Sequence, residues 1–332
     1  MKHLNESLDE FARAWASSLP YIETETSGST GEPKMIRLSK HDMLCSARAT
    51  LEFLKIRKGS RFICPMDFRY IGAKMMYVRA KIADGELINP PPSNLFSFDG
   101  FADLLAIVPS QVDNFIAQPT LLSRIKNIII GGSFLNNYRR DFLLEYQHKN
   151  KNELKIFCTY GMTETASHVA LSPLSSDIYT GLPGITFSKD SRDCLVINLI
   201  GRDANQVVTN DIVELIDGSN FRIIGRHDNV INSGGLKIQP ELIEPYIETV
   251  LNKFKIPFSG ILVTSSPSAK WGEEAVCFIE TSINLNECQI KIITENVKQS
   301  LEDKRKAPRK YIAITKLNRT STGKIIRKIK SK

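Results

Sequence analysis

A short loop near the start of the chain carries the residue types that bind phosphate. Small hydroxylated residues and two glycines are followed there by a cation, in the order Thr26, Ser27, Gly28, Ser29, Thr30, Gly31 and Lys34. Glycine can adopt positive φ angles, so successive backbone N–H groups can point into one concavity, and the hydroxyl groups add donors. This pattern predicts a nucleoside triphosphate site with Lys34 as the countercharge. The spacing is not that of a Walker A motif, and an ordinary surface turn can have the same composition.

The elements around this loop predict an α/β body. Residues 21–25 alternate as in a β-strand, and residues 39–53 have helical periodicity with Ser39 as an N-cap, so a strand and a helix flank the loop. Residues 5–17 predict an amphipathic helix. Further strands are predicted at 61–65, 127–130 and 155–159, and further helices at 100–107 and 137–146. Alternating strands and helices are typical of α/β folds.

The pattern changes after Gly181. Short predicted strands indicate a small β-rich subdomain over about 181–227, and they lie at 194–199, 206–209, 212–216 and 221–224. Beyond it, residues 239–251 predict a helix, and residues 260–264 and 275–280 predict strands. We therefore predict two domains, 1–227 and 228–332, of which the second is a small α+β domain.

Composition narrows the class of protein. The net charge of +8 arises mainly near the C-terminus, where residues 228–332 hold 18 Lys and Arg against 11 Asp and Glu. Such a charge suits a phosphorylated ligand, nucleic acid or anionic lipid. The six cysteines form no Cys-x-x-Cys pair, which argues against a zinc cluster. No stretch approaches the ~20 apolar residues that span a bilayer, and no apolar leader is present, which predicts a cytoplasmic protein without membrane insertion.

Five motifs occur along the chain in a recognisable order. They are the loop at 26–34, the segment 159–165 at the end of a predicted strand, and the segments 209–211, 225–228 and 318–324. In order and context they resemble the adenylate-forming superfamily of acyl-CoA synthetases, luciferases and peptide-synthetase adenylation domains. The resemblance covers the chain from residue 26 nearly to its end. It implies that superfamily's fold, with a mobile C-terminal domain, and it implies ATP, Mg²⁺ and CoA as ligands.

The same resemblance implies catalytic roles for Thr163, Glu164 and Lys324 and an ATP-binding role for Asp211. Glu164 would hold Mg²⁺, whose charge offsets the phosphates of ATP, and Thr163 would contact the α-phosphate. Asp211 would accept hydrogen bonds from both ribose hydroxyls, and Lys324 would be the mobile lysine of the adenylation step.

Further roles follow from the other motif positions. Contacts with the nucleotide are implied for Gly131, Gly132, Tyr160, Gly161, Met162 and Arg226. Asp228 matches the hinge about which the C-terminal domain rotates between the two steps. The CoA pantetheine would be lined by Ser233, Gly234, Gly235 and Lys237.

Two segments, 70–79 and 161–170, resemble the 2-succinylbenzoate–CoA ligases of menaquinone biosynthesis, in a compact form. Such a substrate carries one carboxylate to be activated and another to be recognised, and recognition requires a cation in an apolar pocket. Arg79, or Lys74 as second choice, could meet that carboxylate. Ser167 and His168 could line the aromatic ring. Surface charges and a helix-capping histidine are the alternatives.

The expected reaction has two steps, in which ATP converts a carboxylate to an acyl-adenylate and CoA then displaces AMP. Only 25 residues precede the phosphate loop, so we expect a shortened first domain. Met35, Asn210 and Asn232 also depart from the family pattern. The alternatives are a CoA ligase for another aryl or keto acid, a non-catalytic nucleotide-binding relative, and a nucleic-acid-binding protein. The sequence leaves the oligomeric state open.

Overall fold

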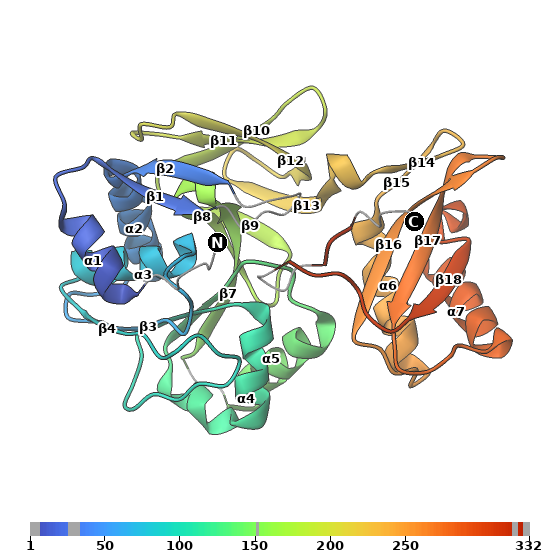
Figure 1. The fold of residues 1–332 in the computed structure, drawn as a ribbon, viewed down its shortest axis with the longest axis horizontal. Coiled ribbons are helices and arrows are strands. Elements are labelled where there is room, and N and C mark those ends of the chain that lie inside the picture. The colour runs from blue at the N-terminus through green and yellow to red at the C-terminus, as the bar shows by residue number, and fades with distance from the viewer. Residues whose placement is uncertain (1–6, 26–33, 151–152, 321–324, 328–332) are drawn as a thin grey trace. The chain divides into compact units, whose positions relative to one another are not determined.

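The computed structural model describes residues 7–25, 34–150, 153–320 and 325–327. The chain divides into two compact units, which Figure 1 draws largely from blue to yellow and from orange to red. The first comprises Met1–Ser188, Val196–Val208 and Leu215–Arg222, and the second comprises Lys189–Leu195, Thr209–Glu214 and Ile223–Lys332. The domain boundary at residue 227 stays a prediction. None of the described helices is long and apolar enough to cross a membrane.

The helices follow capping and periodicity signals in the sequence. They are α1 (Leu8–Ala16), α2 (Lys40–Leu54), α3 (Ile71–Ile82), α4 (Asp113–Ala117), α5 (Asn137–Asn150), α6 (Pro240–Lys253) and α7 (Glu287–Ser300). Short 3₁₀ helices are η1 (Pro109–Val112), η2 (Pro119–Arg124), η3 (Thr163–Thr165), η4 (His227–Asn229) and η5 (Lys304–Lys306). Ser39 caps α2 by accepting a hydrogen bond from the backbone of Asp42, as predicted. Ser7 and Glu10 form a capping box at the start of α1.

The strands of the N-terminal half are β1 (Tyr21–Glu25), β2 (Met35–Ser39), β3 (Arg61–Ile63), β4 (Glu86–Ile88), β5 (Leu104–Ile107), β6 (Asn127–Ile130), β7 (Lys155–Met162) and β8 (Ser167–Pro173). Those that follow are β9 (Ile178–Gly181), β10 (Ile185–Lys189), β11 (Cys194–Leu199), β12 (Gln206–Leu215), β13 (Asn220–Arg226), β14 (Ile231–Ser233), β15 (Leu236–Ile238), β16 (Gly260–Ser268), β17 (Gly272–Glu280) and β18 (Lys310–Ile314).

Within the described residues, eleven strands form one sheet in the order β10-β11-β12-β13-β9-β8-β7-β6-β5-β3-β4. From β4 to β7 neighbouring strands are parallel, and β8 then pairs antiparallel with β7 and with β9. Strands β5 and β6, in the middle of this parallel part, are buried along their whole length because both of their faces are covered. Phe115 of α4 and Leu143 of α5 join these strands in one core. This mixed α/β sheet confirms the predicted fold class.

A smaller sheet has the order β15-β14-β17-β16, with β18 parallel to β17. Helices α6 and α7 pack against it through Ile247, Leu251, Ile293 and Val297, which are fully or nearly fully buried. The α+β character predicted for the C-terminal part is therefore confirmed (Figure 1).

Four predicted elements were wrong in part. Residues 100–107 do not form a helix. The apolar run Leu104–Ile107 is strand β5, which is buried between strands β3 and β6. A short apolar run in a sequence is compatible with either a helix or a strand. The two strands predicted between 206 and 216 are one strand, β12. The strand predicted to end at Thr159 continues as β7 to Met162.

An unpredicted strand follows the predicted phosphate loop in the sequence. Strand β2 pairs antiparallel with β1, and the register runs from Tyr21 opposite Ser39 to Glu25 opposite Met35. The segment between the two strands therefore starts and ends at neighbouring points. The predicted phosphate ligands Thr26, Ser27, Gly28, Ser29, Thr30 and Gly31 lie outside the described residues, as does Lys324.

Candidate active site

The hairpin of β7 and β8, with the turn η3 between its strands, holds seven of the described candidate residues: Tyr160, Gly161, Met162, Thr163, Glu164, Ser167 and His168. The register of the pair shifts between Tyr160 and Gly161, which marks a β-bulge. A side chain at Gly161 would place its Cβ 2.5 Å from His168 Cα and against the Ser167 carbonyl, so glycine is required there. Gly161 is thus explained by this close backbone approach, and its predicted contact with nucleotide stays a prediction.

The turn of the hairpin is strained and held by one hydroxyl group. Ala166 and Ser167 have φ angles of 53° and 100°, which side chains rarely tolerate. Thr165 Oγ1 accepts from the backbone N–H of Met162 at 3.1 Å and donates toward the Ser167 carbonyl at 2.6 Å. Arg202 adds a hydrogen bond of 3.1 Å to the Thr165 carbonyl. Neither role was predicted from the sequence, because Thr165 stands inside a motif and Arg202 is remote in sequence.

This turn presents Glu164 to solvent, while Thr163 beside it is buried. The two residues form η3 together with Thr165. An exposed carboxylate is a hard oxygen ligand of the kind that Mg²⁺ prefers when it retains water and phosphate ligands. The donor chemistry of Glu164 therefore fits the predicted metal role.

Tyr160 belongs to an aromatic cluster. Its ring lies 5.1 Å from that of Phe221 and 5.9 Å from that of Tyr179, both edge to face. Gly131 lies on the neighbouring strand end, where a Cβ would collide with Thr159 Oγ1, and Gly132 follows with a φ angle of 94°. The glycine pair thus keeps the backbone next to β7 free of side chains, which suits a flat ligand such as adenine.

Arg79 is the most unusual of the candidates. It lies on α3, is 1% exposed, and donates from Nη2 to Ser167 Oγ at 3.1 Å. In the described part of the chain no atom accepts a hydrogen bond from its Nε, and no carboxylate pairs with it. Burial lowers the pKa of its guanidinium to about 9. The expectation that Arg79 is a surface charge is excluded.

Lys74 is also buried, at 1% exposure on the same helix. Its Nζ donates to the carbonyl of Glu23 at 3.2 Å and lies 5.6 Å from the ring centroid of Phe11. Lys74 thus ties α3 to β1 and α1, which leaves Arg79 as the better candidate for a ligand carboxylate.

Ser167 and His168 lie together on β8, so the alternative of a helix-capping histidine was wrong. Both are buried, and Ser167 Oγ is 3.3 Å from His168 Nδ1. Burial lowers the pKa of His168 well below its usual value, and the charges of Arg79 and Arg202 lower it further. The imidazole is therefore neutral near pH 7.

In the second unit, Arg226 connects two of the predicted residues. It donates from Nη1 to Asp211 at 3.2 Å and from Nε and Nη2 to both carboxylate oxygens of Asp228, at 2.9 Å each. Asp211 is 9% exposed, while Asp228 lies exposed in η4 after β13. The arginine thus fixes the carboxylate predicted to bind ribose and engages the residue predicted to act as a hinge.

The predicted CoA residues form a tight hairpin between β14 and β15. Gly234 and Gly235 have φ angles of 60° and 85°, as a two-residue hairpin turn requires. Gly234 packs on Trp271, where a Cβ would lie 2.6 Å from the ring. Ser233 is buried, and Lys237 is exposed on β15. These glycines have a structural explanation, and contact with CoA stays a prediction.

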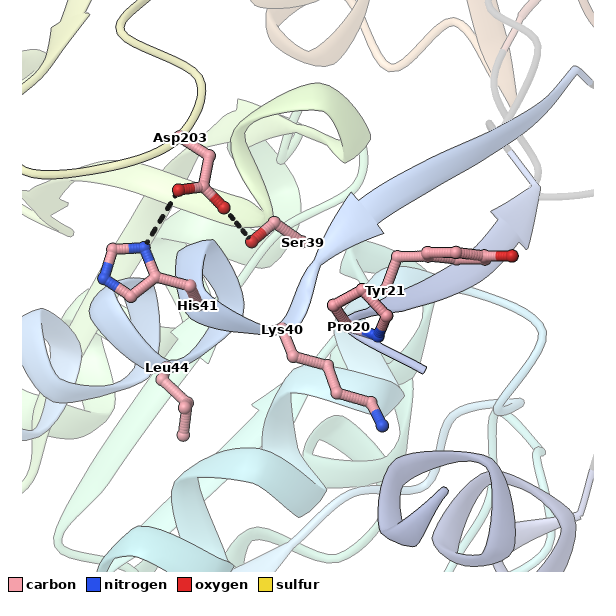
Figure 2. A pocket seen from close by; sticks show the side chains of 7 residues that line it. All are labelled: Pro20, Tyr21, Ser39, Lys40, His41, Leu44 and Asp203. Atoms are coloured by element: carbon pink, nitrogen blue, oxygen red, sulfur yellow. Dashed lines mark hydrogen bonds and ion pairs between the residues drawn. The ribbon is translucent and has the colours of Figure 1, made fainter. Parts of the chain in front are cut away.

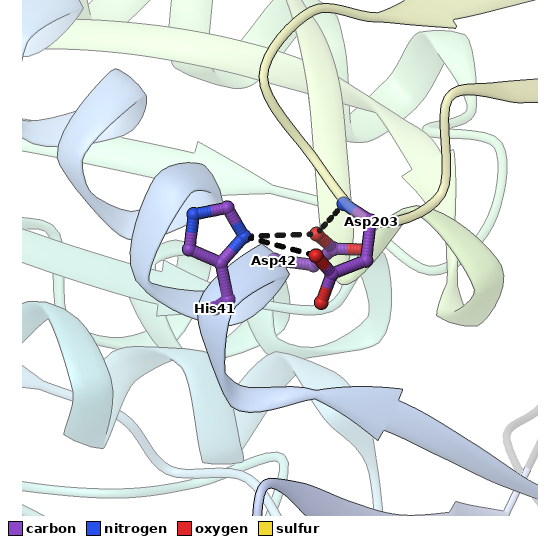
Figure 3. Close-up of side chains that lie close together, drawn as sticks. All are labelled: His41, Asp42 and Asp203. Atoms are coloured by element: carbon purple, nitrogen blue, oxygen red, sulfur yellow. Dashed lines mark hydrogen bonds and ion pairs between the residues drawn. The ribbon is translucent and has the colours of Figure 1, made fainter.

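A cavity of about 440 Å³ lies at the start of α2 (Figure 2). None of the described candidate residues lines it; its lining consists of Pro20, Tyr21, Ser39, Lys40, His41, Leu44 and Asp203. Beside it, His41 Nδ1 lies 3.7 Å from Asp42 and 3.5 Å from Asp203 (Figure 3). Asp42 accepts the backbone N–H groups of Asp203 and Ala204 at 2.6 and 3.1 Å, so this cluster anchors a turn to α2.

Comparison with known proteins shows which sequences the chain is similar to. A family model described as AMP-binding enzyme matches residues 21–191. A 2-succinylbenzoate–CoA ligase of Listeria monocytogenes is 24% identical over 96% of this chain and 71% of its own length. That of Salmonella typhimurium is 26% identical over 76% of this chain and 58% of its own length. The chain thus spans about three fifths to seven tenths of these relatives.

Solved structures show the same fold. An acyl-CoA synthetase (AMP-forming)/AMP-acid ligase II-like protein from Dyadobacter fermentans is 29% identical, with a TM-score of 0.61 over 98% of this chain and 94% of its own. The o-succinylbenzoate coenzyme A synthetase from Bacillus subtilis, solved with ATP and magnesium ion, is 18% identical, with a TM-score of 0.72 over 92% of this chain and 68% of its own. From the family match and this shared fold, the chain belongs to the AMP-binding enzyme family.

Proposed function

We propose that the chain is an AMP-forming ligase that joins a carboxylic acid to coenzyme A through an acyl-adenylate. Membership of the AMP-binding family supports this activity, and so do the names of its relatives. The first step forms a bond between the acid and the α-phosphorus of ATP and releases diphosphate. In the second, the CoA thiolate forms the thioester and AMP leaves.

We propose further that the acid carries a second anionic group, as 2-succinylbenzoate does. The observation that carries this is Arg79, a buried guanidinium whose Nε has no acceptor among the described residues. Burying an unpaired charge is costly, and a ligand carboxylate would offset that cost with charge-assisted hydrogen bonds. Because Arg79 is 1% exposed, the side chains that cover it must move aside when the acid binds. Such a role would place the protein in menaquinone synthesis.

The described residues divide the work at the nucleotide. Glu164 would hold Mg²⁺, which when bound offsets the charge of the phosphates. Tyr160 and the turn at Gly131 would flank the adenine, and Asp211, held by Arg226, would accept from the ribose hydroxyls. Positions outside the described residues complete the proposal, since the loop at 26–31 would bind the β- and γ-phosphates and Lys324 would stabilise charge during adenylation.

The second step would use the C-terminal part. Asp228 would act as the hinge, with the domain boundary at 227, and the hairpin at 233–235 would line the pantetheine with Lys237 beside it. We propose a cytoplasmic enzyme, in keeping with these soluble co-substrates.

The test is a panel assay with purified protein, ATP, Mg²⁺ and CoA. Diphosphate release and thioester formation are measured with 2-succinylbenzoate, with aryl and keto monoacids, and with aliphatic acids. We expect the highest kcat/KM for 2-succinylbenzoate. A monoacid that is turned over better would replace it as the substrate, and the absence of diphosphate release with every acid would refute the ligase itself.

A further inference from the structure

Four buried polar side chains and one backbone carbonyl connect two helices to the hairpin of β7 and β8. Arg79 Nη2 lies 3.1 Å from Ser167 Oγ, and Ser167 Oγ lies 3.3 Å from His168 Nδ1. On its other side, His168 Nε2 lies 3.0 Å from Thr50 Oγ1 of α2, and Thr50 Oγ1 lies 3.1 Å from the carbonyl of Ser46, one turn earlier. All five residues are 8% exposed or less, so water does not replace these bonds easily.

The two ends of this chain fix the direction of every hydrogen bond. A guanidinium only donates, so Ser167 Oγ accepts from Arg79 and has its own proton to give. At the other end the Ser46 carbonyl only accepts, so the Thr50 hydroxyl donates to it. Thr50 Oγ1 must then accept from His168 Nε2–H, and His168 Nδ1 must accept from the Ser167 hydroxyl.

The opposite tautomer satisfies fewer groups. With the proton on Nδ1, His168 would donate to Ser167 Oγ, which already accepts from Arg79, and the serine proton would lose its acceptor. Thr50 would have to turn its proton from the Ser46 carbonyl to Nε2. A tautomer that leaves a buried donor without an acceptor is disfavoured several-fold to a hundredfold in the equilibrium between the two tautomers. The Nε2–H tautomer of His168 therefore dominates.

We infer that Thr50 is a positioning residue: it holds His168 as the Nε2–H tautomer and, through Ser167, orients the guanidinium of Arg79. The orientation matters because Nη2 is anchored while Nε keeps its donor for a ligand. The final link, from Arg79 to the acid, rests on the proposed function. The chain of bonds from Thr50 to Arg79 does not.

The direct test reads the tautomer by NMR of the full chain carrying ¹⁵N-labelled histidine. The sequence has five histidines, and His168→Asn identifies the signals of His168 by their loss. We expect a neutral ring with the proton on Nε2 near pH 7. In Thr50→Val, Nε2–H loses its acceptor, and a shift of the population toward Nδ1–H is expected. Thr50→Ser keeps the hydroxyl and should keep the Nε2–H tautomer.

A matched control removes the same kind of helix bond elsewhere. Thr294 Oγ1 donates to the Ile290 carbonyl at 2.7 Å in α7, and Thr294→Val should leave the His168 signals unchanged. An Nδ1–H ring in the wild type, or a Thr50→Val ring that stays fully Nε2–H, would overturn the inference. Neither readout requires turnover, so a failure here is distinct from a failure of the proposed ligase activity.

Turnover then tests the link to Arg79. Thr50→Val should raise the KM for the preferred acid about five- to fiftyfold with a smaller change in kcat and in the KM for ATP, because a misdirected donor weakens binding of the acid. Thr50→Ser should restore the KM. A tautomer that shifts while the KM stays constant would disprove the link from Ser167 to acid binding.

Discussion

Replacing Arg79 by methionine should stabilise the protein while it weakens binding of the acid. The two effects have opposite signs because a buried charge without a carboxylate partner raises the energy of the folded state, and the same charge is what a dicarboxylate would recognise. A residue with only a structural role would lower stability and activity together.

The size of the stabilising effect follows from the pKa. Burial lowers the pKa of Arg79 from 12.5 to about 9, which corresponds to roughly 5 kcal/mol against the charged form. Because the folded pKa is below the unfolded one, this cost is fully present at every pH below about 9. The variant also loses the hydrogen bond to Ser167, which lowers the stability by about 1.5–3 kcal/mol. A net gain of about 2–3.5 kcal/mol is expected for Arg79→Met near pH 7.

Denaturant and thermal unfolding at pH 7 measure this gain, which corresponds to a rise in midpoint of roughly 4–10 °C. The kcat/KM for 2-succinylbenzoate should fall about 30- to 3000-fold. This is the typical effect of removing one partner of a buried charge pair, which leaves the other charge unpaired. Lys81→Met is the matched control, since Lys81 lies on the same helix, is exposed and has its Nζ 5.6 Å from the ring of Tyr77. It should change neither quantity appreciably.

Two results would contradict this role of Arg79. In one, Arg79→Met is less stable than the wild type by 2 kcal/mol or more, on the order of one lost buried hydrogen bond. In the other, the variant is stabilised and turns over the dicarboxylate as well as the wild type does. The first result would make Arg79 a structural cation, and the second would remove it from the acid site.

Three further substitutions are predicted. Gly161→Ala should destabilise the folded protein by about 3 kcal/mol or more, because the new Cβ would lie 2.5 Å from His168 Cα. Gly218→Ala is the control and should have little effect, because its Cβ would meet nothing within 4 Å. The unfolding midpoints of the two variants test this prediction. Asp42→Ala leaves two backbone N–H groups without their acceptor, so stability should fall by about 2–4 kcal/mol and hydrogen exchange at those amides should accelerate. Glu164→Gln should leave stability unchanged and slow diphosphate release by roughly 100-fold; an unchanged rate would exclude Glu164 as the metal ligand.

Local signals in the sequence predicted the elements that have strong caps or clear periodicity. Helices α2 and α6 begin within one residue of the predicted positions, because Ser39 caps the first and because Pro240 and Glu241 stand in the first turn of the second. Strand β5 was predicted as a helix because four apolar residues satisfy either period, and only its neighbours β3 and β6 decide. Strand β2 was missed because its evidence is its pairing with β1 across the loop.

Some candidate residues can likewise be predicted from local sequence, and others depend on distant contacts. Glu164 and Asp211 stand in contiguous motifs, so the sequence alone could propose them. The role of Thr50 depends on a contact with His168, which is 118 positions away in the chain, and no local pattern distinguishes this threonine from any other on an amphipathic helix.

The buried chain from Thr50 to Arg79 bears on the cost of a polar interior next to the proposed acid site. The hydroxyls of Thr50 and Ser167 and the imidazole of His168 each have an acceptor for their proton, whereas Arg79 Nε is buried without an acceptor among the described residues. A ligand that supplies one carboxylate oxygen there would satisfy this donor, whereas a monoacid bound for activation alone would leave Nε unsatisfied. Arg79→Met should therefore no longer discriminate between the two classes of acid. The kcat/KM for the dicarboxylate should fall, and that for the monoacid should change little.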